Sequence, residues 1–293
     1  MPEVISREQS EGRTSLFVTV EGVTFHALDW GGDGAPLLLV HGGRRTGRSW
    51  NAVARRLRND FRVIALDTRG HGESDGPETG YRAREGAQDM AGIVEELDLP
   101  PHYIMSHSYG GAISGLYATN HPDRVLGMVM IEPVPEGPAH WVRVNVLNED
   151  LTEKPGPGRR NSWVSLEDLK RRLESNNMTS VWTQEALEDV LNEETIVLPD
   201  GRAEAAWSLN SYNMEEMATD EFMLIDGADR LTMPVLIVVA EENNLLESHQ
   251  RPLAQALPRG EFLVMPDVGH AIYMQVPDET ANIARSFLLS SRD

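Results

Sequence analysis

Short apolar runs alternate with longer stretches of mixed polarity over the first 132 residues of the chain. Residues 14–20 and 23–30 are rich in strand-forming residues and are separated by Glu21-Gly22, which predicts a hairpin at the edge of a sheet. The next runs are continuously apolar, and turn residues or helical patterns follow them: residues 36–40, 61–66, 103–105 and 125–131. Continuous apolar strands are typical of a parallel sheet that helices cover on both faces.

This alternation stops between residues 133 and 230, where the chain is acidic and consists of helix-length polar segments with scattered tryptophans. It resumes with an apolar run at 235–239, a helix near 248–257, a strand at 262–265 and a final helix at 278–289. We therefore expect an α/β core domain formed by residues 1–132 and 231–293. Residues 133–230, called the cap segment below, are expected to form a mainly helical insertion.

The 293-residue chain has 40% hydrophobic and 25% charged residues and a formal charge of −20, which indicates an acidic globular protein. This charge repels phosphate backbones and anionic lipids, so we expect no nucleic-acid or membrane partner. The first 15 residues hold no apolar segment, and no run approaches the ~18 apolar residues of a membrane span. A cytoplasmic monomer or homodimer is the expectation.

One stretch opposes the acidic balance, because seven arginines lie between residues 44 and 62 with a single acid, Asp60. These arginines are Arg44, Arg45, Arg48, Arg55, Arg56, Arg58 and Arg62. We interpret them as a solvated loop and helix face that balances the acidic remainder of the chain. A local basic patch for a phosphate-bearing partner is the alternative.

A glycine-rich turn, Ser106-His107-Ser108-Tyr109-Gly110-Gly111, stands between the third core strand and the next helix. A nucleophile on a sharp strand-to-helix turn needs small residues two positions before and after it. Ser106 and Gly110 meet this need, although Gly is usual where Ser106 stands. The backbone N–H of Tyr109 lies at the helix start, where the helix dipole favours an oxyanion. The turn alone could equally be a glycine turn capped by a serine.

Three further motifs follow predicted strands. His41-Gly42-Gly43 comes after the first core strand, the segment from Asp67 to Ser74 matches D-x-R-G-x-G-x-S after the second, and Asp267-Val268-Gly269-His270 comes after the last. With the serine turn between them, these motifs stand in the order of the α/β-hydrolase family, which the chain resembles at both ends. The resemblance implies a mostly parallel central sheet flanked by helices with a variable cap, for which the cap segment shows no match.

By this resemblance Ser108 is the nucleophile, His270 is its base, and the backbone N–H groups of Gly43 and Tyr109 form the oxyanion hole. His41 and His71 are expected to be structural residues of their loops. His107 flanks the nucleophile, so it either lines the substrate pocket or packs beneath it.

The acid of the triad departs from the usual pattern. The family most often places it in the turn after the strand at 235–239, but here the expected position holds Asn243, and an amide supplies no charge. Some relatives carry the acid directly after the strand that precedes the cap, which corresponds to Glu132. We therefore predict Glu132. Glu241 or Glu242 in a shifted turn, and a site without an effective acid, are the alternatives.

A serine nucleophile argues against the aspartate-dependent dehalogenases and epoxide hydrolases of this fold. We predict a hydrolase of an ester or a lactone that acts through an acyl-enzyme on Ser108. A carbon–carbon bond hydrolase, a catalytically silent ligand-binding protein, and a cofactor-free lyase or oxygenase are the alternatives. The Asn at position 243 is the main support for the silent binder.

The tryptophans and methionines of the cap segment indicate a small and largely apolar substrate, and a small core of the cap itself is the alternative for these residues. We name Arg44, His107 and Trp141 as candidate substrate-binding residues. Arg44 and Arg45 directly follow Gly43, so either is close enough in sequence to reach a substrate carboxylate. No cofactor or metal is expected, since the histidines lack metal-binding spacing, the chain has no cysteine, and no G-x-G-x-x-G follows a strand.

Overall fold

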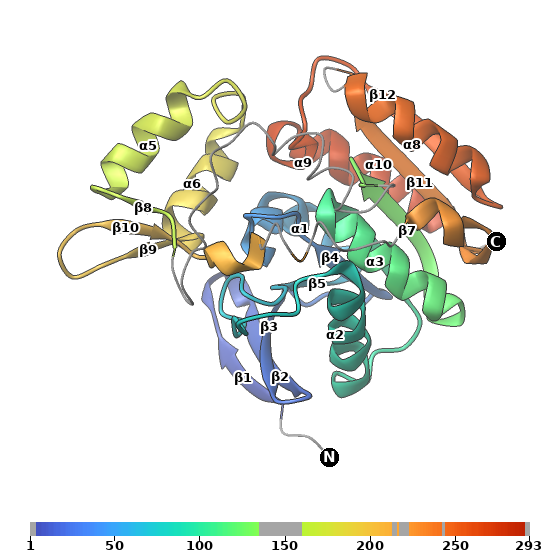
Figure 1. Cartoon of the computed structure of the whole chain (residues 1–293), viewed down its shortest axis with the longest axis horizontal. Helices are drawn as coiled ribbons and strands as arrows, with labels where there is room; N and C mark the ends of the chain where they lie inside the picture. Colours follow the sequence, from blue (N-terminus) through green and yellow to red (C-terminus); the bar gives the residue numbers. More distant parts are fainter. Residues whose placement is uncertain (1–3, 135–159, 213–215, 217–222, 242–243, 291–293) are drawn as a thin grey trace.

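The computed structural model describes residues 4–134, 160–212, 216, 223–241 and 244–290 (Figure 1). Among these residues, nine strands form one sheet in the order β1-β2-β3-β5-β4-β6-β7-β11-β12. The strands are β1 (Ile5–Glu8), β2 (Thr14–Val20), β3 (Val23–Asp29), β4 (Pro36–Val40), β5 (Arg62–Leu66), β6 (His102–His107), β7 (Val125–Ile131), β11 (Val235–Ala240) and β12 (Gly260–Met265).

The strands from β5 to β12 in this order are parallel to one another, whereas β1, β2 and β3 pair in antiparallel fashion, and β3 is also antiparallel to β5. Every residue of β4 and β11 is buried, which explains why their sequences are apolar without alternation. Strand β6 is also buried throughout, although it contains His102, Ser106 and His107. The predicted α/β fold with a mostly parallel central sheet is confirmed.

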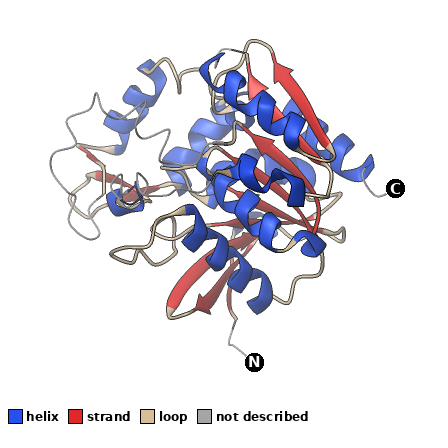
Figure 2. Ribbon diagram, turned by 45° about the vertical axis from the view of Figure 1, so that its right-hand side comes forward, coloured by secondary structure: helices blue, strands red, loops and turns tan. Residues whose placement is uncertain are grey.

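Helices cover both faces of this sheet (Figure 2). Helices α2 (Ala83–Glu96), α3 (Tyr109–Asn120) and α8 (Asn244–Ala256) contribute to one apolar cluster. Helices α1 (Asn51–Leu57), α9 (Ile272–Gln275) and α10 (Pro277–Ser290) contribute to the cluster on the other face. Short 3-10 helices lie in the connections: η1 (Ser10–Gly12), η2 (Gly47–Trp50) and η3 (Pro122–Arg124).

The predicted hairpin of β2 and β3 is present, but it does not form the edge of the sheet. Strand β1 pairs outside β2, so the edge lies one strand further out than expected. All four residues of β1 are exposed, and they therefore show no alternation of apolar and polar positions. Such a strand leaves no hydrophobic signal in the sequence.

The described part of the cap segment contains both helices and a small sheet, where mainly helices were expected. Strands β8 (Ser162–Trp163), β9 (Thr195–Val197) and β10 (Ala203–Ala205) form the sheet beside α5 (Leu166–Ser175) and α6 (Gln184–Glu193), to the left in Figure 1. These strands are too short to give a clear pattern. The 3-10 helix η4 (Leu209–Tyr212) follows, and η5 (Leu224–Arg230) packs against α3 and α8.

The arginine-rich stretch faces acids of the cap segment rather than solvent alone. Arg55 forms a two-pronged ion pair with Asp189 of α6, at 2.9 Å for both contacts. Arg56 binds Glu185 at 3.0 Å, and Arg48 binds Glu193 at 3.1 Å. The solvated-face interpretation is therefore wrong for these arginines, because a helix that is distant in sequence neutralises them.

A buried carboxylate, Asp67, connects three segments of the core. It accepts hydrogen bonds from the Gly47 N–H at 2.7 Å and the Glu73 N–H at 3.0 Å, and it lies 2.7 Å from His26 Nδ1. Burial alone would raise the pKa of the Asp67 carboxyl, but these contacts outweigh it and hold the pKa well below its ordinary value. Gly72 is needed beside it, since a Cβ there would lie 1.9 Å from Asp67 Oδ2.

We expect Asp67→Asn to lower the free energy of unfolding at neutral pH by about 3 kcal/mol, because an amide cannot accept from all of these donors. The difference from the parent should be constant above pH ~5 and should shrink as the pH falls below 3.8, the ordinary pKa of the carboxyl. Below this pH the Asp67 carboxyl is protonated in the unfolded chain but stays ionised in the folded protein, so the folded state loses stability. Urea unfolding between pH 3 and pH 7 measures this, with Asp33→Asn at an exposed position as control. A pH-independent difference would contradict the assignment.

Candidate active site

The carboxyl ends of the parallel strands meet at one edge of the sheet, and this edge carries the residues that the motifs single out. The loop after β4 (residues 41–46, called the β4 loop below) contains Gly43. Ser108 follows β6, Glu132 follows β7, and His270 lies beyond β12. Residues from distant parts of the chain are thereby collected at the edge where α/β sheets bind ligands.

Ser108 occupies a strained turn between β6 and α3, with φ of 49° and ψ of −119°. The turn is tight, because a Cβ on Gly110 would lie 2.4 Å from the carbonyl oxygen of His41. The Ser108 N–H is held by Ile131 O at 2.9 Å, and Ser108 O accepts from the Gly111 N–H at the same distance. Ser106 stands two residues earlier, where glycine is usual, and its fully buried hydroxyl has no hydrogen-bond partner within the described residues. This is the backbone geometry that presents a nucleophile at a strand end.

The side chain of Glu132 is fully buried and directed at His270. Glu132 Oε2 lies 3.1 Å from His270 Nδ1, and Oε1 accepts from the Ala240 N–H at 2.6 Å. The residue has a left-handed φ of 49°, which turns its side chain away from the direction of β7. The carboxylate thus stands where it can hold His270 Nδ1–H as the donor and leave Nε2 free of a proton.

The other acid candidates are placed differently. Glu241 is exposed directly after β11, and its N–H donates to Met265 O at 2.9 Å. Glu242 and Asn243 lie outside the described residues. Of the acids that the structure describes after β7 and β11, Glu132 is the one in contact with the imidazole.

His270 is held from its backbone as well as from its ring. His107 Nε2 lies 3.0 Å from the carbonyl oxygen of His270, and the two rings are 4.6 Å apart. Ser108 is the residue after His107, so Ser108 and His270 lie on neighbouring segments. Within the described part of the chain, no hydrogen bond joins Ser108 Oγ to the imidazole of His270. Such catalytic contacts are often long until a substrate is bound.

His107 is buried beneath His270 and does not open onto solvent. Burial, assisted by the nearby His270, holds the pKa of His107 well below its ordinary value, so the imidazole is neutral. Nε2 of His107 therefore carries the proton and donates to the carbonyl of His270. Of the two roles considered for His107, this position favours packing beneath the site.

His41 and His71 are both buried and bonded to the loops that contain them. The Thr68 N–H donates to His41 Nε2 at 3.1 Å, while His41 Nδ1 lies 2.7 Å from Gly42 O. His71 contacts Arg69 O at 2.9 Å, and burial lowers its pKa to about 3. Neither side chain is placed to act as a second base.

The two oxyanion-hole candidates flank the serine turn. Gly42 is packed so closely that an added Cβ would lie 3.1 Å from Ser108 Cβ, and Gly43 is the next residue of this loop. Tyr109 begins α3, and its hydroxyl donates to Tyr81 O at 2.6 Å. The backbone N–H groups of Gly43 and Tyr109 thus belong to segments that adjoin Ser108.

The two arginines after Gly43 differ in exposure, and Arg45 is the more buried of the two. Arg44 is exposed, with φ of 61°, whereas Arg45 lies 4.6 Å from the centre of the Trp182 ring and 3.0 Å from Glu194. The sequence does not distinguish these two arginines, and no sequence motif marks Glu194. The third candidate, Trp141, lies outside the described residues.

Within the described ranges, no three His, Asp or Glu side chains are grouped closely enough to hold a metal ion. The same ranges contain no helix with the length and apolar character needed to cross a bilayer.

A family model with the description Alpha/beta hydrolase family matches residues 37–283, which include every motif that follows a core strand. The chain belongs to the alpha/beta hydrolase family. This alpha/beta hydrolase is 22% identical to an sn-1-specific diacylglycerol lipase of Mus musculus over 98% of its own length and 92% of the relative. It is 35% identical to a 2-(acetamidomethylene)succinate hydrolase of Mesorhizobium japonicum, over 45% of this chain and 44% of the relative.

Solved structures show the same fold. A crystal structure of E-2-(acetamidomethylene)succinate hydrolase aligns with a TM-score of 0.77 and 24% identity, over 98% of this alpha/beta hydrolase and 99% of that chain. Est816, described as an N-acyl homoserine lactone degrading enzyme, aligns with a TM-score of 0.71 and 22% identity, over 92% of this chain and 99% of that chain. At these identities the likeness establishes the architecture alone.

The neutral state of His107 predicts a pH-dependent loss of stability in this alpha/beta hydrolase. Below pH 6.5 the unfolded imidazole takes up a proton that the folded one refuses, so stability falls as the pH falls. Replacing His107 by Gln, which keeps a donor for His270 O, should flatten this fall by up to about 1.4 kcal/mol per pH unit. Urea unfolding from pH 7.5 to pH 5 measures both slopes. Equal slopes would mean that His107 protonates in the folded state.

Proposed function

We propose that this alpha/beta hydrolase is a serine hydrolase that cleaves an ester or a lactone of a small molecule through an acyl-enzyme on Ser108. The observation that carries the proposal is the 3.1 Å contact between His270 Nδ1 and a fully buried Glu132. It supports a complete nucleophile–base–acid set. A silent binding protein drew its main support from the missing acid at position 243, and the position of Glu132 removes that support.

The first half of the reaction forms the acyl-enzyme. Ser108 Oγ attacks the substrate carbonyl as its proton passes to His270 Nε2, and the Glu132 carboxylate stabilises the imidazolium. The negative oxygen of the tetrahedral intermediate accepts hydrogen bonds from the Gly43 and Tyr109 N–H groups, each worth ~10²–10³ in rate. When the intermediate collapses, His270 gives its proton to the leaving oxygen.

The second half returns the enzyme to its starting state. Water attacks the acyl-enzyme as His270 accepts its proton, and the second intermediate expels Ser108 Oγ, which takes the proton back from His270. Hydrolysis of acyl compounds agrees with the names of similar proteins, which include a lipase and a lactone-degrading enzyme. The acyl group and the protons are transferred among the substrate, water, Ser108 and His270, so the reaction needs no further reactant.

Labelling by a fluorophosphonate tests the nucleophile. The parent should gain one adduct, read by intact mass and located on Ser108 by peptide mapping, and Ser108→Ala should gain none. Ser106→Ala is the matched control, because it removes a buried hydroxyl two residues away and should leave labelling unchanged. Absence of labelling of the folded parent would favour a binding protein.

Substitution of the acid tests the rest of the site. Glu132→Gln keeps the shape of the side chain but loses its charge, so turnover of ester or lactone substrates should fall by ~10²–10⁴. Glu241→Gln removes a carboxylate from the exposed turn after β11 and should retain the turnover of the parent. Steady-state kinetics on a small panel of esters and lactones measures both. Equal activity of Glu132→Gln and the parent would end the assignment of Glu132.

A further inference from the structure

Glu194 follows helix α6 in the cap segment, and its charged side chain is only 3% exposed. Its Oε1 accepts from both the backbone N–H and the hydroxyl of Thr46, at 2.7 Å each, and Oε2 accepts from Arg45 Nη1 at 3.0 Å. A buried carboxylate is stable only where donors replace water. These donors belong to the β4 loop, so a cap residue is bonded directly to the loop that carries Gly43.

The backbone of Glu194 is itself fixed. Its N–H donates to Val190 O at 3.2 Å, and its carbonyl accepts from the Ala206 N–H at 3.0 Å. One contact anchors it to the last turn of α6 and the other to the segment after β10. The carboxylate is therefore presented to the β4 loop from a rigid part of the cap segment.

The β4 loop needs such support because its backbone is strained. Arg44 has φ of 61°, a conformation that costs an L-residue energy and persists only where its surroundings impose it. The core holds the loop at both ends. At the start of the loop the Thr68 N–H donates to His41 Nε2, and just after its end the Gly47 N–H donates to Asp67 Oδ1. Glu194 holds the remaining part, at Arg45 and Thr46.

We propose that Glu194 is a positioning residue that sets the backbone N–H of Gly43 for oxyanion binding, and that the cap segment thereby controls the competence of the core site. This role rests on the proposed serine hydrolase function. An oxyanion donor lowers the activation barrier only when it is already in place. Displacement of the donor therefore raises the energy of the transition state more than that of the bound substrate. Loss of Glu194 should therefore appear in kcat rather than in KM.

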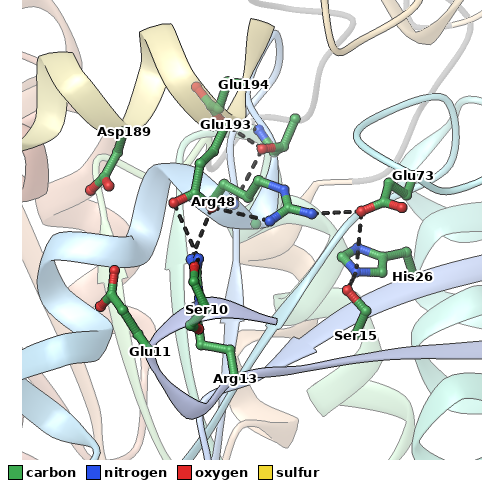
Figure 3. Close-up of polar contacts among 12 residues, drawn as sticks. Ser10, Glu11, Arg13, Ser15, His26, Arg48, Glu73, Asp189, Glu193 and Glu194 are labelled. Atoms are coloured by element: carbon green, nitrogen blue, oxygen red, sulfur yellow. Dashed lines mark hydrogen bonds and ion pairs between the residues drawn. The ribbon is translucent and has the colours of Figure 1, made fainter. Parts of the chain in front are cut away.

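Neighbouring acids connect the same helix to other parts of the core. Glu193 reaches Arg13 and Arg48, and Arg48 in turn binds Glu73, as Figure 3 shows. Asp189 binds Arg55 in α1. Arg48 also donates its N–H to Thr46 Oγ1 at 3.2 Å, whereas the Asp189–Arg55 ion pair docks α6 on α1 and includes no residue of the β4 loop. Docking and loop positioning can therefore be separated by mutation of Asp189.

The experiment compares Glu194→Gln and Glu194→Ala with Asp189→Asn as the matched control. Asp189→Asn removes a poorly exposed carboxylate from the same helix and breaks an equally direct contact with the core. Two measurements are made on the full chain: kcat and KM for an ester that the parent hydrolyses, and hydrogen exchange of peptides covering residues 41–50. Thermal unfolding confirms that each variant is folded.

Glu194→Ala should lower kcat ~10- to 100-fold with KM changed less than about threefold, and should speed exchange in residues 41–50. Glu194→Gln keeps an acceptor for Thr46 and should fall between Ala and the parent. Asp189→Asn should leave kcat and this exchange unchanged, even where it lowers the melting temperature.

The outcomes separate this role from the proposed function. If the parent is labelled at Ser108 and turns over esters, but Glu194→Ala keeps its kcat or its exchange in residues 41–50, the positioning role is overturned and the hydrolase stands. An equal fall of kcat in Asp189→Asn would overturn it as well, since docking alone would then explain the effect. A folded parent with neither labelling nor turnover overturns the proposed hydrolase, and this role with it.

Discussion

The buried carboxylate of Asp67 is the constraint on which the arrangement of the core depends. It binds one residue from the antiparallel hairpin, His26, one from the connection after β4, Gly47, and one from the turn after β5, Glu73. A charge removed from water must be satisfied by several donors at once, so it fixes these segments relative to one another. The seam between the antiparallel and parallel parts of the sheet, and one flank of the β4 loop, are set by this requirement.

Much of this architecture could be predicted from sequence because the signals are local. A strand covered on both faces must be apolar at every position, and β4, β7 and β11 therefore stand out without any knowledge of their neighbours. The turn around Ser108 has a local motif of small residues, but the contact that requires glycine at position 110 is not local, since an added Cβ would lie 2.4 Å from the carbonyl oxygen of His41 in the β4 loop. Glu132 could be predicted for a related reason. It is the residue after β7, and the order of the strands places it at the edge of the sheet where the parallel strands end.

The remaining features depend on contacts between distant parts of the chain and leave no periodic trace. Arg48, Arg55 and Arg56 find their acids 129 to 145 residues later in the sequence. Arg44 is exposed and has a left-handed backbone, while Arg45 contacts Trp182 and Glu194, and no neighbouring residue signals this difference. Strand β1 pairs with β2 through its backbone, and its side chains are exposed, although Arg7 forms an ion pair with Glu73. Such choices are made by tertiary structure, which a pattern of polarity along the chain does not encode.

The junction at Pro133 has a consequence for how this family can diversify. Gln250, fully buried in α8, donates to Pro133 O at 2.8 Å, and the Pro133 ring packs so closely on Gly111 that a Cβ there would lie 2.9 Å away. Glu132 is held to the core through this next residue and through its own N–H, which donates to Val238 O at 2.8 Å. A chimera that grafts a foreign lid onto this scaffold has a natural splice point beyond Pro133, because a splice any earlier would carry away the residue that faces His270.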